Sequence, residues 1–205
     1  MAVVPCGAYG NKLYKLVPII GTIMESKENI VLGLFFNSPT REWHFEEILK
    51  EAKIARSRAV LWLEKFVREG LVRRVKERYR MPYYVGNCES PEYQNRKRIF
   101  GLGMLQDSGL LNHLASLGKA KSVILFGSFS RWDWHESSDI DVFIYGDPEG
   151  LKIASYEFKL HRNIQLFICQ ENRELNVLGP GLIKNIISGD LIKGDLNFVK
   201  VAANA

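Results

Sequence analysis

The first regular pattern of hydrophobic and polar positions in the chain is helical and covers residues 24–70. After Met24, apolar residues recur at helical spacing, and the turn signal NSP at residues 37–39 ends this first run. The same spacing predicts a second helix over residues 46–52 and a third over residues 57–69, which Gly70 caps. We therefore expect three consecutive helices.

The residues that follow the third helix favour strands. Residues 72–85 (VRRVKERYRMPYYV) divide into two short runs that suit a hairpin with a basic turn. Three helices followed by a basic hairpin is the order of elements in a winged helix-turn-helix domain. The segment HFEEILKEAKIARSRAVLWLEKFVREGLVRR also resembles that family, and the resemblance covers about residues 26–86. It implies a domain of the DNA-binding type.

Residues 1–23 lie outside this pattern. They show neither a helical nor an alternating period, and prolines and glycines interrupt them, so we expect short extended or irregular structure there. Because the helical pattern begins just after Met24, we hypothesise that translation starts at Met24. The intact mass of the native protein tests this hypothesis, and detection of the 205-residue form would contradict it.

Later in the chain, a strand of the buried type leads into a candidate phosphate site. Residues 123–126 (VILF) are continuously apolar, and the run ends abruptly at Gly127 and Ser128. Glycine at a strand end lets the backbone approach a ligand closely, and Ser128 would begin the next helix with its hydroxyl group and neighbouring amides free. Such a helix start is suited to phosphate.

Two acidic residues, Asp139 and Asp141, follow Gly127 and lead into the apolar run at residues 142–144. Side chains alternate along a strand, so both carboxylates project from one face, with Cα atoms about 7 Å apart. Residues 140, 142 and 144 then face the core. Two carboxylates on one face suit Mg²⁺, which is bound by few carboxylates together with waters and substrate phosphates.

The stretch SVILFGSFSRWDWHESSDIDVFIYGD combines both features. It resembles the nucleotidyltransferase superfamily that includes the beta-type DNA polymerases, and most closely its minimal nucleotidyltransferase branch, whose pattern is G-S, a short helix and S-D-x-D. The resemblance covers about residues 95–200, including the ending ISGDLIKGDL, which is similar to the family's C-terminal helix and strand. It implies the following site: Gly127, Ser128 and Arg131 bind a nucleoside triphosphate, and Asp139 and Asp141 are catalytic and bind Mg²⁺.

Two positions depart from the family's pattern. Trp132 stands where the family usually has glycine, which makes the loop over the phosphates bulkier. Gln165 stands where the family has its third metal-binding carboxylate, on a strand whose core face is Ile164, Leu166 and Ile168. Because glutamine is neutral, nucleotide binding could survive while catalysis suffers. The nearest candidate substitutes in sequence are Glu157 and Asp147.

The loop before Asp139 contains three further candidates. Trp132 and Trp134 either stack on a nucleobase or pack to fix the loop, and both alternatives are open at this point. His135 either contacts phosphate or is solvated. The four histidines form no HxH or HExxH pattern, which argues against a zinc site.

The predicted fold class is α+β, with two domains. A helical segment over residues 93–117, interrupted by glycines, predicts two helices that follow a hinge at residues 86–91. The expected organisation is an N-terminal extension at 1–23, a winged helix-turn-helix domain at 24–86, a helical linker at 87–117 and a nucleotidyltransferase domain at 118–205, built on a mixed sheet flanked by helices.

Charge is concentrated in the middle of the chain. The formal net charge is +5, and residues 41–100 carry fifteen basic and nine acidic residues. Phosphate contacts from such residues give affinity for duplex DNA that depends on salt. The apolar Leu61 and Trp62 on the same helix read bases poorly, so the alternative is that they bury against another segment or a second protomer. The candidate DNA-binding residues are Arg56, Ser57, Arg58, Arg73, Arg74, Lys76 and Arg78, with Arg80 also in the wing.

Cysteine usage and hydropathy indicate a compartment. The three cysteines lie too far apart for a CxxC metal site or a disulfide framework, which suits a reducing cytoplasm. No apolar run approaches about 18 residues, and the N-terminus lacks the order of a secretory signal. We therefore expect a cytoplasmic protein without a membrane partner.

Three functions fit these features. The first is an Mg²⁺-dependent nucleotidyltransferase that transfers a nucleoside monophosphate from a nucleoside triphosphate to an acceptor hydroxyl. The second is a DNA-binding regulator that binds nucleotide as an effector with little or no turnover. The third, also from resemblance, is an antitoxin that modifies or masks a small helical toxin-like protein. A homodimer is compatible with each of these functions.

Overall fold

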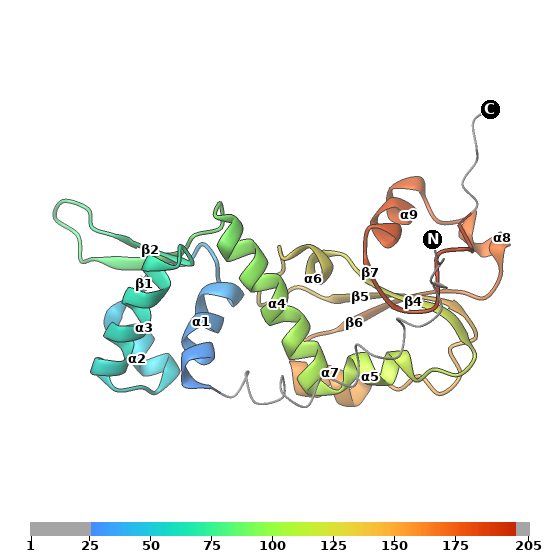
Figure 1. Cartoon of the computed structure of the whole chain (residues 1–205), viewed down its shortest axis with the longest axis horizontal. Helices are drawn as coiled ribbons and strands as arrows, with labels where there is room; N and C mark the ends of the chain where they lie inside the picture. Colours follow the sequence, from blue (N-terminus) through green and yellow to red (C-terminus); the bar gives the residue numbers. More distant parts are fainter. Residues whose placement is uncertain (1–25, 200–205) are drawn as a thin grey trace, which may run out of the picture.

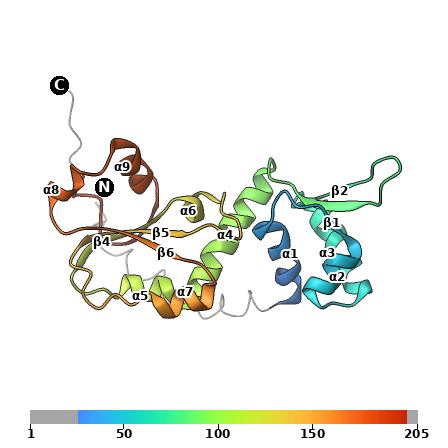
Figure 2. The same ribbon diagram turned by 180° about the vertical axis from the view of Figure 1, so that it is seen from behind.

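The computed structural model describes residues 26–199. The expectations for residues 1–23, irregular structure and a start at Met24, lie outside these residues. Two structured parts flank a long helix, α4 (Pro91–Ser108), in both views of the chain (Figures 1 and 2). We refer to residues 26–86 as the N-terminal part and to residues 110–199 as the C-terminal part.

The N-terminal part contains three helices and a small antiparallel sheet. The helices are α1 (Lys27–Asn37), α2 (Phe45–Ala52) and α3 (Arg56–Arg68), and the strands are β1 (Trp43–His44), β2 (Val72–Val75) and β3 (Tyr83–Gly86), in the spatial order β1-β3-β2. The three predicted helices and the predicted hairpin are confirmed. The sequence does not predict β1, because two residues are too few to show an alternating pattern.

Local chemistry fixes the ends of these elements. The Ser26 hydroxyl group caps α1 by accepting a hydrogen bond of 3.1 Å from a backbone N–H group of its first turn. Gly70 follows α3 at a φ of +72°, the left-handed conformation that ends many helices. In the hairpin turn, Arg80 forms ion pairs with Glu42 and Glu77 at 2.9 and 3.0 Å. These contacts hold the turn against β1.

The segment between the two parts forms two helices, as predicted. α4 ends at Gly109, whose φ is +87°, and α5 (Leu110–Ala115) begins there. The expected hinge is a loop at residues 87–90, and it is fixed by contacts on both sides. The Asn87 side chain donates to the Gly70 carbonyl oxygen at 2.9 Å, and the Tyr93 hydroxyl group donates to the Phe35 carbonyl oxygen at 2.8 Å. None of the helices in residues 26–199 is long and apolar enough to cross a membrane.

The C-terminal part is built on a mixed sheet. Its strands are β4 (Ala120–Phe126), β5 (Ile140–Gly146), β6 (Ile164–Cys169) and β7 (Asp190–Lys193), in the spatial order β6-β5-β4-β7. β4 pairs antiparallel with β5 and β7, and β5 pairs parallel with β6. The connecting helices are α6 (Ser128–Arg131), α7 (Ala154–Leu160), α8 (Asn172–Leu175) and α9 (Pro180–Ile187). The predicted α+β class and mixed sheet are confirmed.

The two faces of this sheet bury different clusters. Ile140, Val142 and Ile144 face the cluster formed with α5 and α7, and this cluster continues through α4 to the helices of the N-terminal part. Phe143 belongs to a smaller cluster with Ile186 of α9, on the opposite face (Figures 1 and 2). The expected core face of β6 is wrong at Ile168, which is 40% exposed, because β6 is the edge strand.

A cluster of aromatic residues lies where the two parts meet. Trp134 is fully buried and stacks on Phe129 of α6, with a centroid distance of 5.2 Å. Phe100 of α4 and Phe36 of α1 contact the same indole ring at 6.3 and 6.4 Å. Gly101 leaves room for this ring, because a Cβ atom there would lie 2.8 Å from the indole nitrogen. One tryptophan therefore contacts elements of both parts and the helix between them.

Candidate functional site

Gly127 connects β4 to α6 in a conformation that requires glycine. Its φ is +73° with a ψ of −146°, a region that residues with a Cβ atom rarely occupy. A Cβ atom at this position would overlap the Asp141 carboxylate, whose Cγ atom would be only 2.9 Å away. The carboxylate of Asp141 therefore lies directly against the Gly127 backbone.

The helix that begins at Ser128 is a single turn. Arg131 N donates to the Gly127 carbonyl oxygen at 3.2 Å, and Trp132 N donates to the Ser128 carbonyl oxygen at 2.9 Å. Ser128 is half-buried, whereas Phe129 is buried under the turn. Arg131 is exposed and pairs with Asp133 at 3.3 Å. The buried ring anchors the turn and leaves Ser128 and Arg131 in contact with solvent.

The two predicted metal ligands lie at the start of β5. Asp139 immediately precedes the strand and is exposed, and Asn163 donates a hydrogen bond of 3.3 Å to its carboxylate. Asp141 is half-buried. Burial raises the pKa of Asp141, the negative charge of Asp139 raises it further, and the positive charge of Arg131 lowers it. Both carboxylates and the Arg131 guanidinium group therefore act on one region of space.

This electrostatic arrangement predicts a stability change for Asp141→Asn. The folded chain holds the Asp141 proton more tightly than the unfolded chain, because the pKa is raised above 3.8. Stability is therefore lost as the pH rises from about 4 through the raised pKa. We expect Asp141→Asn to melt at a higher temperature than the wild type at about pH 7 and to lose that advantage at about pH 3, where both side chains are neutral.

Thermal unfolding at the two pH values measures this effect. The control is Asp133→Asn, which removes an exposed carboxylate that is paired with Arg131. We expect no stabilisation by this control at neutral pH. An Asp141→Asn variant that melts below the wild type at about pH 7 would show that the carboxylate is compensated in the folded chain.

Gln165 lies beside Asp141 in the sheet. The two residues are direct partners in the parallel pairing of β5 and β6, and partners in such a register project from the same face. Gln165 is exposed. The side chain next to the two carboxylates is thus a neutral amide, which cannot take a proton from an acceptor group at ordinary pH.

The two candidate substitutes for a third carboxylate each have other partners. Glu157 is on α7 and accepts a hydrogen bond of 2.9 Å from Ile164 N, so it supports the start of β6. Asp147 follows the opposite end of β5, where Lys119 is 3.9 Å away. Asp147 is therefore at the end of β5 far from Asp141. Glu157 lies near the end that carries Asp141, because Ile164 pairs with Ile140, and its carboxylate is bonded there to a backbone N–H group.

The donor set is suited to a hard cation that arrives with its substrate. Within residues 26–199, no group of three or more His, Cys, Asp and Glu side chains forms a complete metal site. Asp139 and Asp141 offer carboxylate oxygen atoms, and Gln165 offers an amide oxygen atom. Mg²⁺ is commonly held by one or two carboxylates and completed by waters and phosphates. These residues therefore fit Mg²⁺ bound to a triphosphate.

The two tryptophans of the loop between α6 and β5 lie in different environments. Trp134 is buried in the aromatic cluster, so it packs to fix the loop and does not stack on a nucleobase. Trp132 is half-buried, and its φ is +107°, a conformation that costs a residue with a side chain about 1–3 kcal/mol. His135 is exposed and contacts the Ser137 hydroxyl group at 3.1 Å. The strained backbone at Trp132 is one in which glycine is free of strain.

Sequence reasoning does not identify Arg162 or Asn163 as part of the site. Both residues precede β6, and Asn163 contacts Asp139 directly. Arg162 is buried beneath the same loop. An arginine next to a strand is usually exposed, so the sequence contains no signal of its burial.

The predicted DNA-binding residues are distributed over three elements. Ser57 and Arg58 are exposed at the start of α3, and Lys76 and Arg78 are exposed in the hairpin turn. On β2, Arg73 and Arg74 alternate and so project from opposite faces of the small sheet. Arg56 pairs with Glu46. The structure therefore does not bring all seven residues together.

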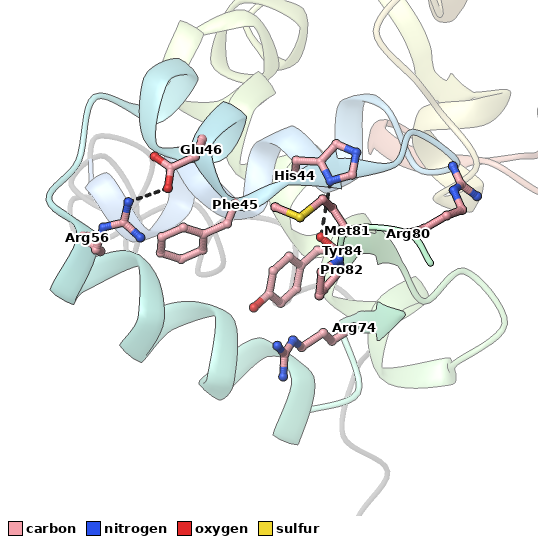
Figure 3. A pocket seen from close by; sticks show the side chains of 9 residues that line it. All are labelled: His44, Phe45, Glu46, Arg56, Arg74, Arg80, Met81, Pro82 and Tyr84. Carbon is pink, nitrogen blue, oxygen red and sulfur yellow. Dashed lines mark hydrogen bonds and ion pairs between the residues drawn. The ribbon is translucent and has the colours of Figure 1, made fainter. Parts of the chain in front are cut away.

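Two of the seven, Arg56 and Arg74, line one hollow (Figure 3). Its volume is about 580 Å³, and the ring of Phe45 and the ring of Tyr84 lie between the two guanidinium groups. Arg80 lines the hollow at its other side, and the remaining lining residues are His44, Glu46, Met81 and Pro82.

The two apolar residues of α3 that the sequence singled out differ in burial. Trp62 packs against the core, whereas Leu61 is 59% exposed. Of the two residues, Trp62 is therefore buried against another segment, as one alternative expected, whereas Leu61 has no such cover within residues 26–199.

Comparison with known proteins agrees with this geometry. Residues 108–196 match the family described as "Nucleotidyltransferase domain", and they include Gly127, both aspartates and Gln165. A protein of Methanocaldococcus jannaschii named "Putative protein adenylyltransferase" is 57% identical over 32 residues, which are 16% of this chain and 32% of that relative. The match thus spans about a third of the relative's length. No solved structure matches the chain. Residues 108–196 are therefore the part of the chain that is similar to nucleotidyltransferase domains.

Proposed function

We propose that the protein transfers a nucleoside monophosphate from an Mg²⁺-bound nucleoside triphosphate to an acceptor hydroxyl group. The observation that supports this function is the Asp141 carboxylate, which lies against the Gly127 backbone at the end of β4 and is close enough to Asp139 for the second negative charge to raise its pKa. When bound, Mg²⁺ neutralises phosphate charge and orients the reacting oxygen atoms. Arg131 and Ser128 lie on the adjacent turn, where they would contact the phosphates.

The reaction exchanges a phosphoanhydride bond of the triphosphate for a phosphoester bond to the acceptor. The acceptor oxygen forms a bond to the α-phosphorus atom, the bond from that atom to the bridging oxygen breaks, and pyrophosphate leaves. The acceptor proton must pass to a base. Gln165 cannot take it, so the proton passes to solvent or to a phosphate oxygen, and we expect slow turnover. The name of the archaeal relative makes a protein the first acceptor to test and ATP the first donor.

Label transfer tests this proposal. The full chain is incubated with each of the four triphosphates, labelled at the α-phosphate, together with Mg²⁺ and a cell lysate. We expect label in protein, RNA or a small molecule, and none when Mg²⁺ is replaced by a chelator. Transfer from a triphosphate labelled only at the γ-phosphate would instead indicate phosphoryl transfer and contradict the proposal.

A second candidate function is nucleotide binding without turnover, and Gln165 favours it. The amide occupies the position beside Asp141 at which a basic carboxylate would assist proton removal. Under this proposal the triphosphate is an effector and the N-terminal part delivers the output. Binding of Mg²⁺ and triphosphate without label transfer to any fraction of the lysate is the expected result.

We also propose that the N-terminal part is a winged helix that binds duplex DNA. Its order of elements, three helices with a hairpin after the third, supports this proposal. The exposed arginines of β2 and of the hairpin turn are the candidates for phosphate contacts. The exposed Leu61 on α3 offers no hydrogen bond to a base edge, so we expect the affinity to depend mainly on phosphate contacts.

The salt dependence of DNA binding tests this role. Replacing Arg73, Arg74 and Arg78 with alanine removes three cations of the wing, so the log–log slope of affinity against salt should flatten by up to roughly 3 units, about one for each of these cations that contacts a phosphate. Fluorescence anisotropy of a labelled duplex measures the slope. The matched control replaces three exposed cations of the C-terminal part with alanine, Lys152, Arg173 and Lys184. Equal slopes in the two triple variants would assign the effect to net charge and remove the wing from the interface.

A further inference from the structure

Arg162 is a buried cation that joins the candidate site to the N-terminal part. It stands between α7 and β6, and its exposed fraction is 8%. Its guanidinium group lies over the ring of Phe129 at 5.2 Å and over the ring of Trp134 at 5.4 Å. Phe129 belongs to α6, the turn that begins at Ser128. Arg162 thus contacts the underside of the turn and the anchor of the loop that follows it.

The same guanidinium group binds the loop that leads to Asp139. Its Nη1 atom donates to the carbonyl oxygen atoms of His135, Glu136 and Ser138, the last two at 2.8 and 3.0 Å. Ser138 immediately precedes Asp139, and Asn163, the next residue after Arg162, donates to the Asp139 carboxylate. The position of Asp139 is therefore set by two consecutive residues before β6.

A fourth contact of Arg162 reaches the other part of the molecule. Its Nη2 atom donates to the side-chain oxygen of Asn37, the last residue of α1, at 2.8 Å. The backbone oxygen of Asn37 accepts a hydrogen bond of 2.9 Å from Glu136 N in the same loop. The end of α1 therefore supports the loop through both its backbone and its side chain. In Figures 1 and 2, α1 and α6 lie on either side of α4, which agrees with this arrangement.

Arginine is suited to this position because its planar group offers five N–H donors in a fixed geometry. Four oxygen acceptors and two aromatic faces surround it, which compensates for the burial of its charge. Lysine would keep the charge but cannot reach acceptors on two sides in one plane. Arg162→Lys therefore keeps the positive charge and removes the hydrogen-bond geometry, so it tests the two contributions separately.

We propose that Arg162 is a positioning residue for Asp139 and that it acts together with Asn37, so that α1 is a structural part of the nucleotidyl site. This inference rests on the proposed function, because it assumes that Asp139 binds the metal of a triphosphate. It assigns to the N-terminal part a second role, support of the metal site, that does not depend on DNA. A shift of α1 would move the loop that carries Asp139.

The affinity of the full chain for Mn²⁺, measured by electron paramagnetic resonance with ATP present, tests this role without requiring turnover. Replacing a residue that orients a metal ligand typically weakens metal binding 10–100-fold, so we expect Arg162→Lys to weaken Mn²⁺ binding within that range. Asn37→Ala removes one of the four contacts, and we expect a loss of about 10-fold. Asn37→Asp keeps an oxygen acceptor for Arg162, so we expect it to retain wild-type affinity.

The matched control is Asn87→Ala. It also removes one hydrogen bond of a partly buried asparagine side chain, here 2.9 Å to the Gly70 carbonyl oxygen of the N-terminal part, but Asn87 lies away from the loop that leads to Asp139. We expect unchanged Mn²⁺ affinity in this control at a temperature where all variants are folded. Wild-type affinity in Asn37→Ala, or an equal loss in Asn87→Ala, would overturn the positioning role even if Arg162→Lys fails to fold.

A variant with asparagine at both 139 and 141 distinguishes this inference from the proposed function. If that variant loses Mn²⁺ binding while Asn37→Ala binds normally, the metal site is correct and only the positioning role is wrong. If the double variant binds Mn²⁺ as the wild type does, the site itself is wrong, and both the proposed function and the role of Arg162 are overturned.

Discussion

Replacing Asp139 and Asp141 together with asparagine should abolish metal-dependent binding of nucleoside triphosphates. Two carboxylates supply the negative charge of the site, and asparagine keeps the shape of each side chain while removing that charge. We expect a loss of more than about 100-fold, beyond the range that outer-shell changes produce. Calorimetric titration of ATP in the presence of Mg²⁺ and in the presence of a chelator measures the metal-dependent part.

The expected loss must come from the site and not from unfolding. Because Asp141 is half-buried beside a second carboxylate, its neutralisation should leave the fold intact or stabilise it at neutral pH. The melting temperature of the double variant therefore serves as its own control. A stable double variant that still binds Mg²⁺ and ATP with wild-type affinity would place the metal elsewhere and refute both proposals that use this site.

Most of the fold follows from patterns that are local in sequence. The apolar run of β4, the glycine that follows it and the alternation in β5 each indicate an element without reference to the rest of the chain. The pairing of Asp139 and Asp141 on one face follows from the same alternation. The sequence predicts Gln165 at the position of the family's third carboxylate, and the register of β5 with β6 places it beside Asp141.

The features that the sequence does not indicate depend on contacts between distant residues. Arg162 and Asn37 are 125 positions apart, and neither residue type predicts burial by itself. Trp134 could equally have been a surface residue of a polar loop until its packing against α1, α4 and α6 was known. Ile168 shows the converse, since an alternating pattern predicts burial only if another strand or helix covers the face.

Trp132 shows how a departure from a family pattern acquires a physical meaning. The sequence indicates only that a bulky residue stands where glycine is usual. The structure adds that the backbone there has a φ of +107°, so the chain keeps a conformation typical of glycine with a tryptophan in it. Strain of this kind is stored mainly at functional sites. The position lies one turn after Ser128, next to the residues proposed to contact the triphosphate.

Under the proposed function, the neutral side chain of Gln165 limits the rate of catalysis. It stands beside Asp141 on the neighbouring strand, where a carboxylate could accept the acceptor proton and complete the metal site. The wild-type chain should therefore bind Mg²⁺ and ATP but transfer nucleotide slowly. We expect Gln165→Asp to raise the transfer rate by about 10²–10⁴-fold, the contribution that a positioned general base typically makes.

Single-turnover label transfer at saturating ATP measures this gain separately from nucleotide affinity. Gln165→Asn is the matched control, because it shortens the side chain equally without adding charge, and it should leave the rate at the wild-type level. The rate of Gln165→Asp should also rise with pH as its carboxyl group loses its proton, whereas the control should not. If the wild type already turns over at about 1 s⁻¹ or faster and Gln165→Asp changes nothing, the general base lies elsewhere, and Gln165 is not what limits the chemistry.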